Sequence, residues 1–144
     1  MTDVTQTDPW ADVVGQDDAV ALLRGAAGPG AVHAWLFLGP RGSGKRAAAR
    51  AFAGDLLADD LDRAGDAEGA ARARSLARAE QHPDLVVVER AGASISAEQA
   101  DEITRRASRS ATEGRRKVLV LDEFHLVPAT VAPKLLKTIE EPPA

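Results

Sequence analysis

The sequence predicts an α/β fold in which a parallel sheet is flanked by helices. Two observations support this prediction. Short apolar runs bounded by turn residues have the composition of strands buried on both faces; they are 34–38 (AWLFL), 84–89 (DLVVVE) and 118–121 (VLVL). The segments between these runs have helical patterns, and strands that alternate with helices are typical of a parallel sheet.

The expected helices are bounded by residues that commonly start and stop helices. The first begins with two acidic residues and ends at a glycine, and the second begins directly after a glycine-rich loop. The helices are expected at 17–25, 45–57, 96–107 and about 130–140, and the alanine-rich stretch 58–81 is also expected to be helical.

Two helix starts have specific capping signals. Ser96 can accept a hydrogen bond from the third helical amide, and Gln99 stands where a capping-box partner belongs. Thr130 is expected to be the N-cap of the last helix, with Pro133 in the first turn, where its missing N–H needs no partner. The proline pair that begins at Pro142 ends this helix.

Composition limits the class of protein. Of the 144 residues, 44% are hydrophobic and 28% charged, which is typical of one globular domain. The net charge of −4 argues against a broadly cationic DNA-binding surface. Without cysteine, disulfides and thiolate metal sites are excluded. Residues 1–9 lack signal-peptide features and are expected to be a flexible leader, and no apolar run reaches the roughly 20 residues of a membrane span. We expect a soluble, cytoplasmic protein.

The segment GPRGSGKR at 39–46 follows the phosphate-loop pattern GxxxxGK[ST] except at its last position. In such a loop, glycines let backbone N–H groups turn toward phosphate oxygens, the lysine adds positive charge, and the next helix presents its N-terminus. A glycine-rich surface turn is the plain alternative, but the expected strand before the loop and helix after it favour phosphate binding. The candidate nucleotide-binding residues are Gly39, Pro40, Arg41, Gly42, Ser43, Gly44, Lys45 and Arg46.

Arg46 departs from the pattern. A serine or threonine at this place normally gives its hydroxyl to Mg²⁺, and a guanidinium has no lone pair to replace it. Arginine could hydrogen-bond a phosphate instead. The substitution therefore predicts that nucleotide binding survives while metal-dependent hydrolysis is slow.

Two acids follow the third apolar run. Asp122 and Glu123 end the sequence VLVLDE, which in P-loop ATPases is the Walker B pattern. There the aspartate holds Mg²⁺ and the glutamate, as the catalytic residue, polarises the attacking water. The carboxyl edge of a parallel sheet is where such folds bind ligands. An ordinary strand end is the alternative. The functional interpretation requires the glycine-rich loop and these acids to lie on the same side of the fold.

Several motifs together resemble those of bacterial clamp-loader AAA+ subunits, in order and approximate spacing. They are Gly15-Gln16, HAWLFLGPRGSGK, HPDLVVVE, VLVLDEFH and LLKTIEEPP, and the last is the most specific. The resemblance implies a AAA+ P-loop NTPase fold with ATP and Mg²⁺ as candidate cofactors, and an adenine-side role for Gly15-Gln16. It also implies a ring that loads the sliding clamp of DNA polymerase III on primed DNA, with gamma/tau, delta and the clamp as partners and DNA contacted indirectly.

The resemblance favours one type of subunit. Gamma/tau motors keep Thr after the lysine, whereas delta-prime subunits often have degenerate phosphate loops, so Arg46 and Phe124 point to delta-prime. An active gamma/tau-type ATPase is the alternative. A P-loop protein outside replication, such as a small nucleotide kinase, is a third hypothesis, against which LLKTIEEPP argues.

Three departures from the family pattern matter. The four-cysteine zinc module is replaced by 58–81, so no zinc is expected and His82 is expected to be structural. Pro133-Lys134 replaces the usual Asn-Ala. The sensor 1 strand, arginine finger, lid and collar would follow Ala144, so 10–144 is expected to be the N-terminal part of a AAA+ domain. The strand at 34–38 would then lack a ladder partner, and the isolated chain would be marginally stable or aggregation-prone.

A dense basic stretch lies after residue 104. It could contact DNA phosphate or a neighbouring subunit, or it could be an ordinary solvated face, and both interpretations stay open. Its members are Arg105, Arg106, Arg109, Arg115, Arg116 and Lys117.

Overall fold

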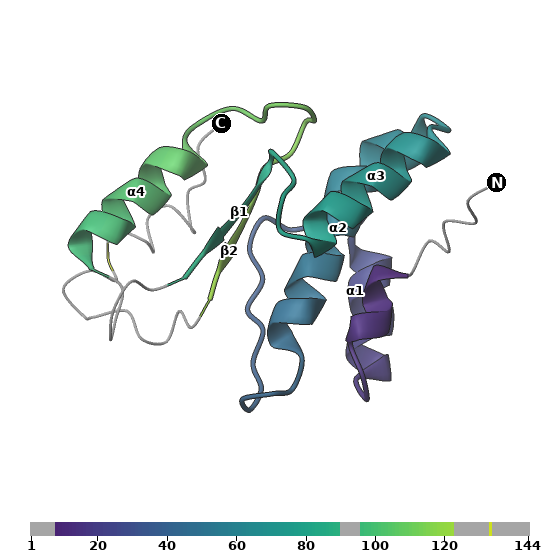
Figure 1. Ribbon diagram of the computed structural model, residues 1–144, viewed down its shortest axis with the longest axis horizontal. Coiled ribbons are helices and arrows are strands. Elements are labelled where there is room, and N and C mark those ends of the chain that lie inside the picture. Colours follow the sequence, from purple (N-terminus) through teal and green to yellow (C-terminus); the bar gives the residue numbers. More distant parts are fainter. Residues whose placement is uncertain (1–7, 90–95, 123–132, 134–144) are drawn as a thin grey trace.

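The computed structural model describes residues 8–89, 96–122 and 133. Helix α4 lies on one side of a two-stranded sheet, and α2 and α3 lie on the other, so these elements form three layers (Figure 1). In chain order the elements are η1 (Pro9–Asp12), α1 (Asp17–Ala26), α2 (Lys45–Arg63), α3 (Ala67–Arg78), β1 (Leu85–Val88), α4 (Ala97–Ala107) and β2 (Val118–Leu121).

Strands β1 and β2 pair in parallel, with Leu85 opposite Val118 and Val88 opposite Leu121. Alternate side chains of a strand point to opposite faces. Leu85, Val87, Val118 and Val120 accordingly pack with Ala53 and Ala77 of α2 and α3. Val88, Leu119 and Leu121 pack with Ala100 and Ile103 of α4. The predicted α/β class with parallel strands is confirmed, although a two-stranded sheet is less than a complete AAA+ fold.

The predicted strand at 34–38 is wrong in this structure. These residues form no strand and lie in the irregular segment between α1 and α2 (Figure 1). The rings of Trp35 and Phe37 contact Phe52, with centroids 5.0 and 6.3 Å apart, whereas Leu36 and Leu38 are 72% and 83% exposed. A strand requires a hydrogen-bonded neighbour. Within the described part of the chain, β1 and β2 pair only with each other.

Most helix predictions are confirmed. Helix α1 extends one residue beyond the expected 17–25, and α2 begins at Lys45 as expected but continues to Arg63. The expected helical stretch 58–81 contains the end of α2, a turn at Gly65 with a φ of 78°, and α3. The side chain of Ser96 caps α4 by accepting a hydrogen bond from the Gln99 N–H at 3.1 Å.

Other expectations fall largely outside the described residues. Of the helix expected at 130–140, only Pro133 is described; it is helical and exposed. Thr130 and the proline pair at Pro142 lie outside. Of the expected leader, Asp8 and Pro9 are described, and the Asp8 carboxylate caps η1 by accepting from the Trp10 N–H at 3.0 Å. No helix in the described ranges is long and apolar enough to cross a bilayer.

Helices α2 and α3 approach each other closely because small residues form their interface. A Cβ atom at Gly54 would lie 3.2 Å from the Cα atom of Arg74 and 3.5 Å from the Ala77 Cβ. The buried alanines of this interface are Ala53, Ala58, Ala70, Ala73 and Ala77. The separation of the two helices is therefore set by contact between backbone and methyl groups.

Enlarging one of these methyl groups is expected to destabilise the protein. Ala77→Leu should lower the free energy of unfolding by about 1–3 kcal/mol, because Ala77 is fully buried and the added carbons have no space. Urea denaturation followed by circular dichroism measures the change. The matched control is Ala67→Leu, at an exposed position at the start of α3. Equal stability of the two variants would contradict the close approach of α2 and α3.

Candidate phosphate-binding site

The glycine-rich loop 39–46 leads directly into α2. Gly42 and Gly44 have φ values of 82° and 89°, in the left-handed region that favours glycine. Gly44 is the N-cap of α2, and no side chain caps this helix end. The first N–H groups of a helix have no acceptor within the helix. The N-terminus of α2 therefore has the arrangement that suits an anion.

Lys45 is the first residue of α2, and its side chain folds back over the loop. Its Nζ donates hydrogen bonds to the Gly39 carbonyl and, at 3.4 Å, to the Pro40 carbonyl. The Ser43 N–H donates to the Pro40 carbonyl at 3.1 Å and closes the turn. Neutral carbonyl groups thus hold the ammonium beside the loop. An anionic ligand would compete with these carbonyl groups for the ammonium.

The guanidinium of Arg46 is surrounded by carboxylates. Its Nε and Nη2 donate to Oε1 and Oε2 of Glu80, each at 2.7 Å, in a bidentate pair. Its Nη1 donates to Glu89 and lies 3.5 Å from Oδ2 of Asp122. The hydrogen bond with Glu80 raises the pKa of Arg46, and the same bond lowers the pKa of Glu80. We call Glu80, Glu89 and Asp122 the carboxylate cluster.

The structure brings two of the predicted site elements together. Asp122 continues the strand pairing, since its N–H donates to the Val88 carbonyl at 3.0 Å, and its carboxylate contacts Arg46. The start of α2 and the end of β2 are therefore on the same side of the fold. Glu123 lies outside the described residues. The roles of 39–46, Asp122 and Glu123 in binding and catalysis remain predictions.

Sequence reasoning missed Glu80 and Glu89. The sequence allows Arg46 to hydrogen-bond a phosphate, but in the structure its Nε, Nη1 and Nη2 all have carboxylate partners. Glu89 ends the predicted strand 84–89, so its place at the sheet edge was a usable signal. Glu80 follows α3 at a left-handed φ of 58°, and no local pattern indicated that it would reach Arg46.

The described residues do not fit a magnesium ion at Asp122. Mg²⁺ takes oxygen ligands and is usually bound through one or two carboxylates, with waters and phosphates in the other positions. Asp122 already lies next to a guanidinium, which carries a permanent positive charge. In the part of the chain that is described, no three His, Cys, Asp or Glu side chains are grouped so that they could hold a metal ion.

The segment expected to lie on the adenine side is next to the loop. Gly15 has a φ of 77°, and Gln16 is the N-cap residue of α1. Val13, just before them, lies 3.9 Å from the position of a Cβ atom at Gly44. Residues near Gly15 are thus close enough to the glycine-rich loop to share a ligand with it.

The His82–Asp84 segment organises the chain before β2. Asp84 is 1% exposed, and its carboxylate accepts hydrogen bonds from the N–H groups of Thr112, Glu113 and Gly114. The Nδ1 atom of buried His82 accepts from the Asp84 N–H at 3.0 Å. His82 and Asp84 therefore have a structural role: they hold the loop before β2 next to the start of β1, where the two strands begin to pair.

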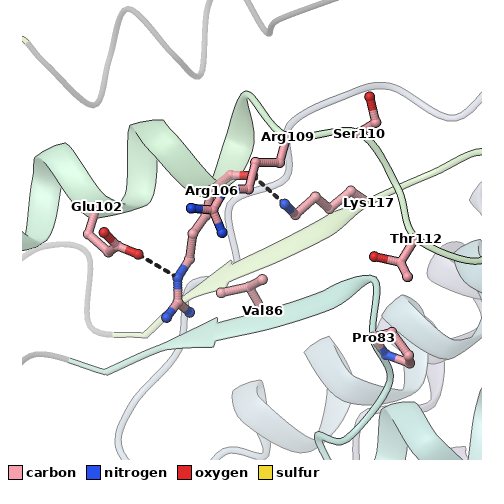
Figure 2. Close-up of a pocket in the computed structure, with 8 residues that line it drawn as sticks. All are labelled: Pro83, Val86, Glu102, Arg106, Arg109, Ser110, Thr112 and Lys117. Carbon is pink, nitrogen blue, oxygen red and sulfur yellow. Dashed lines mark hydrogen bonds and ion pairs between the residues drawn. The ribbon is translucent and has the colours of Figure 1, made fainter.

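Part of the basic stretch lines a surface pocket of about 290 Å³ between α4 and β1 (Figure 2). Arg106 pairs with Glu102 at 3.0 Å, and the Nζ of Lys117 donates to the Arg106 carbonyl. Outside the pocket, Arg105 also pairs with Glu102, and Arg116 donates to the Gly28 carbonyl at 2.8 Å. Several of these cations are therefore held by oxygens of the protein itself. The pocket is lined by Pro83, Val86, Glu102, Arg106, Arg109, Ser110, Thr112 and Lys117.

The fold and this site define an α/β protein with a glycine-rich loop at the edge of a parallel sheet. The chain belongs to the DNA polymerase III, delta subunit family, whose model matches residues 15–144. The resemblance to bacterial clamp-loader subunits is thereby confirmed. No solved structure matches the chain.

Curated relatives carry the names of two subunit types. The gamma/tau subunit of Mycobacterium tuberculosis is 35% identical over 136 residues, which cover 93% of this chain and 23% of the relative. The delta′ subunit of Pseudomonas aeruginosa is 38% identical over 112 residues, covering 76% of this chain and 34% of the relative. The delta′ subunit of Bacillus subtilis is 33% identical. The chain thus spans about a quarter to a third of the length of these relatives.

Proposed function

We propose that this protein is a delta-prime-type clamp-loader subunit of DNA polymerase III holoenzyme, which helps to load the sliding clamp and hydrolyses ATP weakly. One observation carries the choice of subunit type. At the position where a motor subunit needs a hydroxyl for Mg²⁺, this chain has Arg46, whose guanidinium is engaged by Glu80, Glu89 and Asp122. Nucleotide binding in this proposal depends on the loop amides and Lys45.

In this proposal the described residues form the N-terminal part of a AAA+ domain. The exposed Leu36 and Leu38 support a further layer that covers this face of 34–38, since a continuous apolar run is typical of a strand covered on both faces. The partners are the gamma/tau and delta subunits and the clamp, with primed DNA contacted through the assembled ring in the cytoplasm.

The alternative is an active gamma/tau-type ATPase. It is favoured by the extent of the similarity, because the gamma/tau relatives match 93% of the chain whereas the delta′ relatives match 76%. Arg46 argues against it, because a motor that has lost its magnesium ligand loses transition-state stabilisation.

Reconstitution with the full-length protein tests the proposal. Clamp loading on primed DNA by gamma/tau and delta subunits should require this protein, while the protein alone, with clamp and DNA, should turn over ATP only slowly. Rapid turnover by the protein alone would favour the gamma/tau alternative. Failure to enter the complex would reject a clamp-loader role of either type.

A further inference from the structure

The carboxylate cluster joins parts of the chain that are far apart in sequence. Glu80 follows α3, Glu89 follows β1 and Asp122 follows β2, and all three contact Arg46 near the start of α2. Arg46 and Glu80 are partly shielded, with side chains 33% and 22% exposed. A single guanidinium therefore connects four segments at one edge of the sheet.

The charges at this place do not suit a phosphate ligand. Arg46 is joined by Arg50, whose Nη1 lies 3.7 Å from Glu80, so two positive groups face three carboxylates. The bidentate pair with Glu80 uses the planar fork that makes arginine a specific carboxylate partner. The guanidinium is consequently committed to the protein's own acids.

The location of Arg46 is that of a cation in a nucleotide site. It directly follows Lys45 at the N-terminus of α2 and lies 3.5 Å from Asp122 at the carboxyl edge of the sheet. A metal ion at Asp122 would stand next to this permanent charge. Moreover, the three acids are spaced around a planar guanidinium, which is wider than a metal ion, and they are not grouped for metal ligation.

We propose that Arg46 is a built-in cation that takes the place of a divalent metal ion in this site. Its guanidinium closes the site to Mg²⁺ and ties α2 to the ends of β1 and β2 with or without nucleotide. This inference rests on the proposed function only in treating the glycine-rich loop and Asp122 as one site. The other parts of the inference are supported by the ion pairs of Arg46 with the carboxylate cluster.

The experiment compares thermal unfolding of the full-length protein and of Arg46→Met, each in chelator and in millimolar Mn²⁺. Mn²⁺ binding is followed in parallel by electron paramagnetic resonance. The native protein should bind no Mn²⁺ at this place and show no shift. Arg46→Met should melt lower in chelator, because the three acids lose the guanidinium that they share. Mn²⁺ should then raise its melting temperature by about 3 °C or more, because the freed acids, two of them on flexible glutamate side chains, can close around the ion.

Two further variants test whether the response to Mn²⁺ comes from the carboxylate cluster. Adding Glu80→Gln to Arg46→Met should recover part of the stability in chelator and weaken the response to Mn²⁺. Arg63→Met is the matched control, since Arg63 pairs with Asp59 and Asp60 on one helix and its removal leaves two acids outside the cluster. It should show no response to Mn²⁺. If Arg46→Met does not fold, Arg46→Gln, which keeps donors but no charge, replaces it in every comparison.

Two results would overturn the proposal. Equal Mn²⁺ stabilisation of the native protein and Arg46→Met would mean that Arg46 does not close the site. If Arg46→Met binds no Mn²⁺ and its melting temperature does not change with Mn²⁺, the role of Arg46 is only to form structural ion pairs. Neither measurement involves a clamp or DNA. A failure of clamp loading therefore rejects the proposed function alone, and a failed Mn²⁺ response rejects this inference alone.

Discussion

Replacing Trp10 with alanine is expected to lower the free energy of unfolding by about 3–5 kcal/mol. The Trp10 side chain is 5% exposed and belongs to the core cluster with Val13, Leu23 and Phe52. Its Nε1 also donates to Oδ2 of Asp55 at 2.9 Å. Truncation leaves a cavity beneath η1 and removes this hydrogen bond. Urea denaturation followed by circular dichroism measures the loss.

Trp35→Ala is the matched control for this variant. Trp35 is 38% exposed, and its ring contacts Phe52 from the outside of the core at a centroid distance of 5.0 Å. Its removal should cost clearly less stability, because less apolar surface leaves the interior. A loss for Trp10→Ala no greater than that for Trp35→Ala would mean that η1 is not anchored to α2 in solution.

Asp84→Ala is expected to lower the free energy of unfolding by about 2–3 kcal/mol at neutral pH. The substitution removes the acceptor of three backbone N–H groups, and hydrogen bonds to a charged group are stronger than neutral ones. The loop before β2 should loosen first, which hydrogen exchange at Thr112 and Gly114 would detect. Unchanged exchange there would contradict the role given to Asp84.

The contribution of Asp84 should also depend on pH. Burial by itself raises the pKa of this carboxyl. The hydrogen bonds from the N–H groups of Thr112, Glu113 and Gly114 together lower the pKa by more than burial raises it, so the net shift is downward. A carboxyl whose folded-state pKa is depressed stabilises the protein above its unfolded pKa, about 3.9, and loses this effect as the pH falls through the folded value. The stability difference between the native protein and Asp84→Asn should therefore be largest at neutral pH and shrink below about pH 4. A difference that stays constant as the pH falls well below this value would contradict the charge effect.

Local signals predicted most of the fold. Residues close in sequence determine the N-cap of α4, the start of α2 and the apolar runs of β1 and β2, and these features appear where expected. The run 34–38 is short and apolar as well, but a strand also needs a hydrogen-bonded neighbour, which no local pattern reveals. Its side chains alternate as they would in a strand, since Trp35 and Phe37 contact Phe52 whereas Leu36 and Leu38 are exposed. Among the described residues, however, it has no strand to pair with.

The candidate site was predictable only in part. The phosphate-loop and Walker B patterns located Arg46 and Asp122, and the structure brings these two together. The partnership of Arg46 with Glu80 was not predictable, because the two residues are 34 positions apart and meet only through the packing of α3 on α2. The family was recognisable from short motifs. The type of subunit is not decided by similarity, because relatives of both names match.

The small residues between α2 and α3 also affect the entropy of folding. Alanine has no side-chain rotamers to lose when it is buried, so the alanine contacts between α2 and α3 restrict no side-chain motion. Each methyl group buries little area in return. The apolar part of the interface between Lys45–Arg63 and Ala67–Arg78 therefore consists of many weak contacts that require little ordering. The ordering that docking does require falls on polar side chains such as Arg74, which pairs with Asp55 and Asp62 across the two helices.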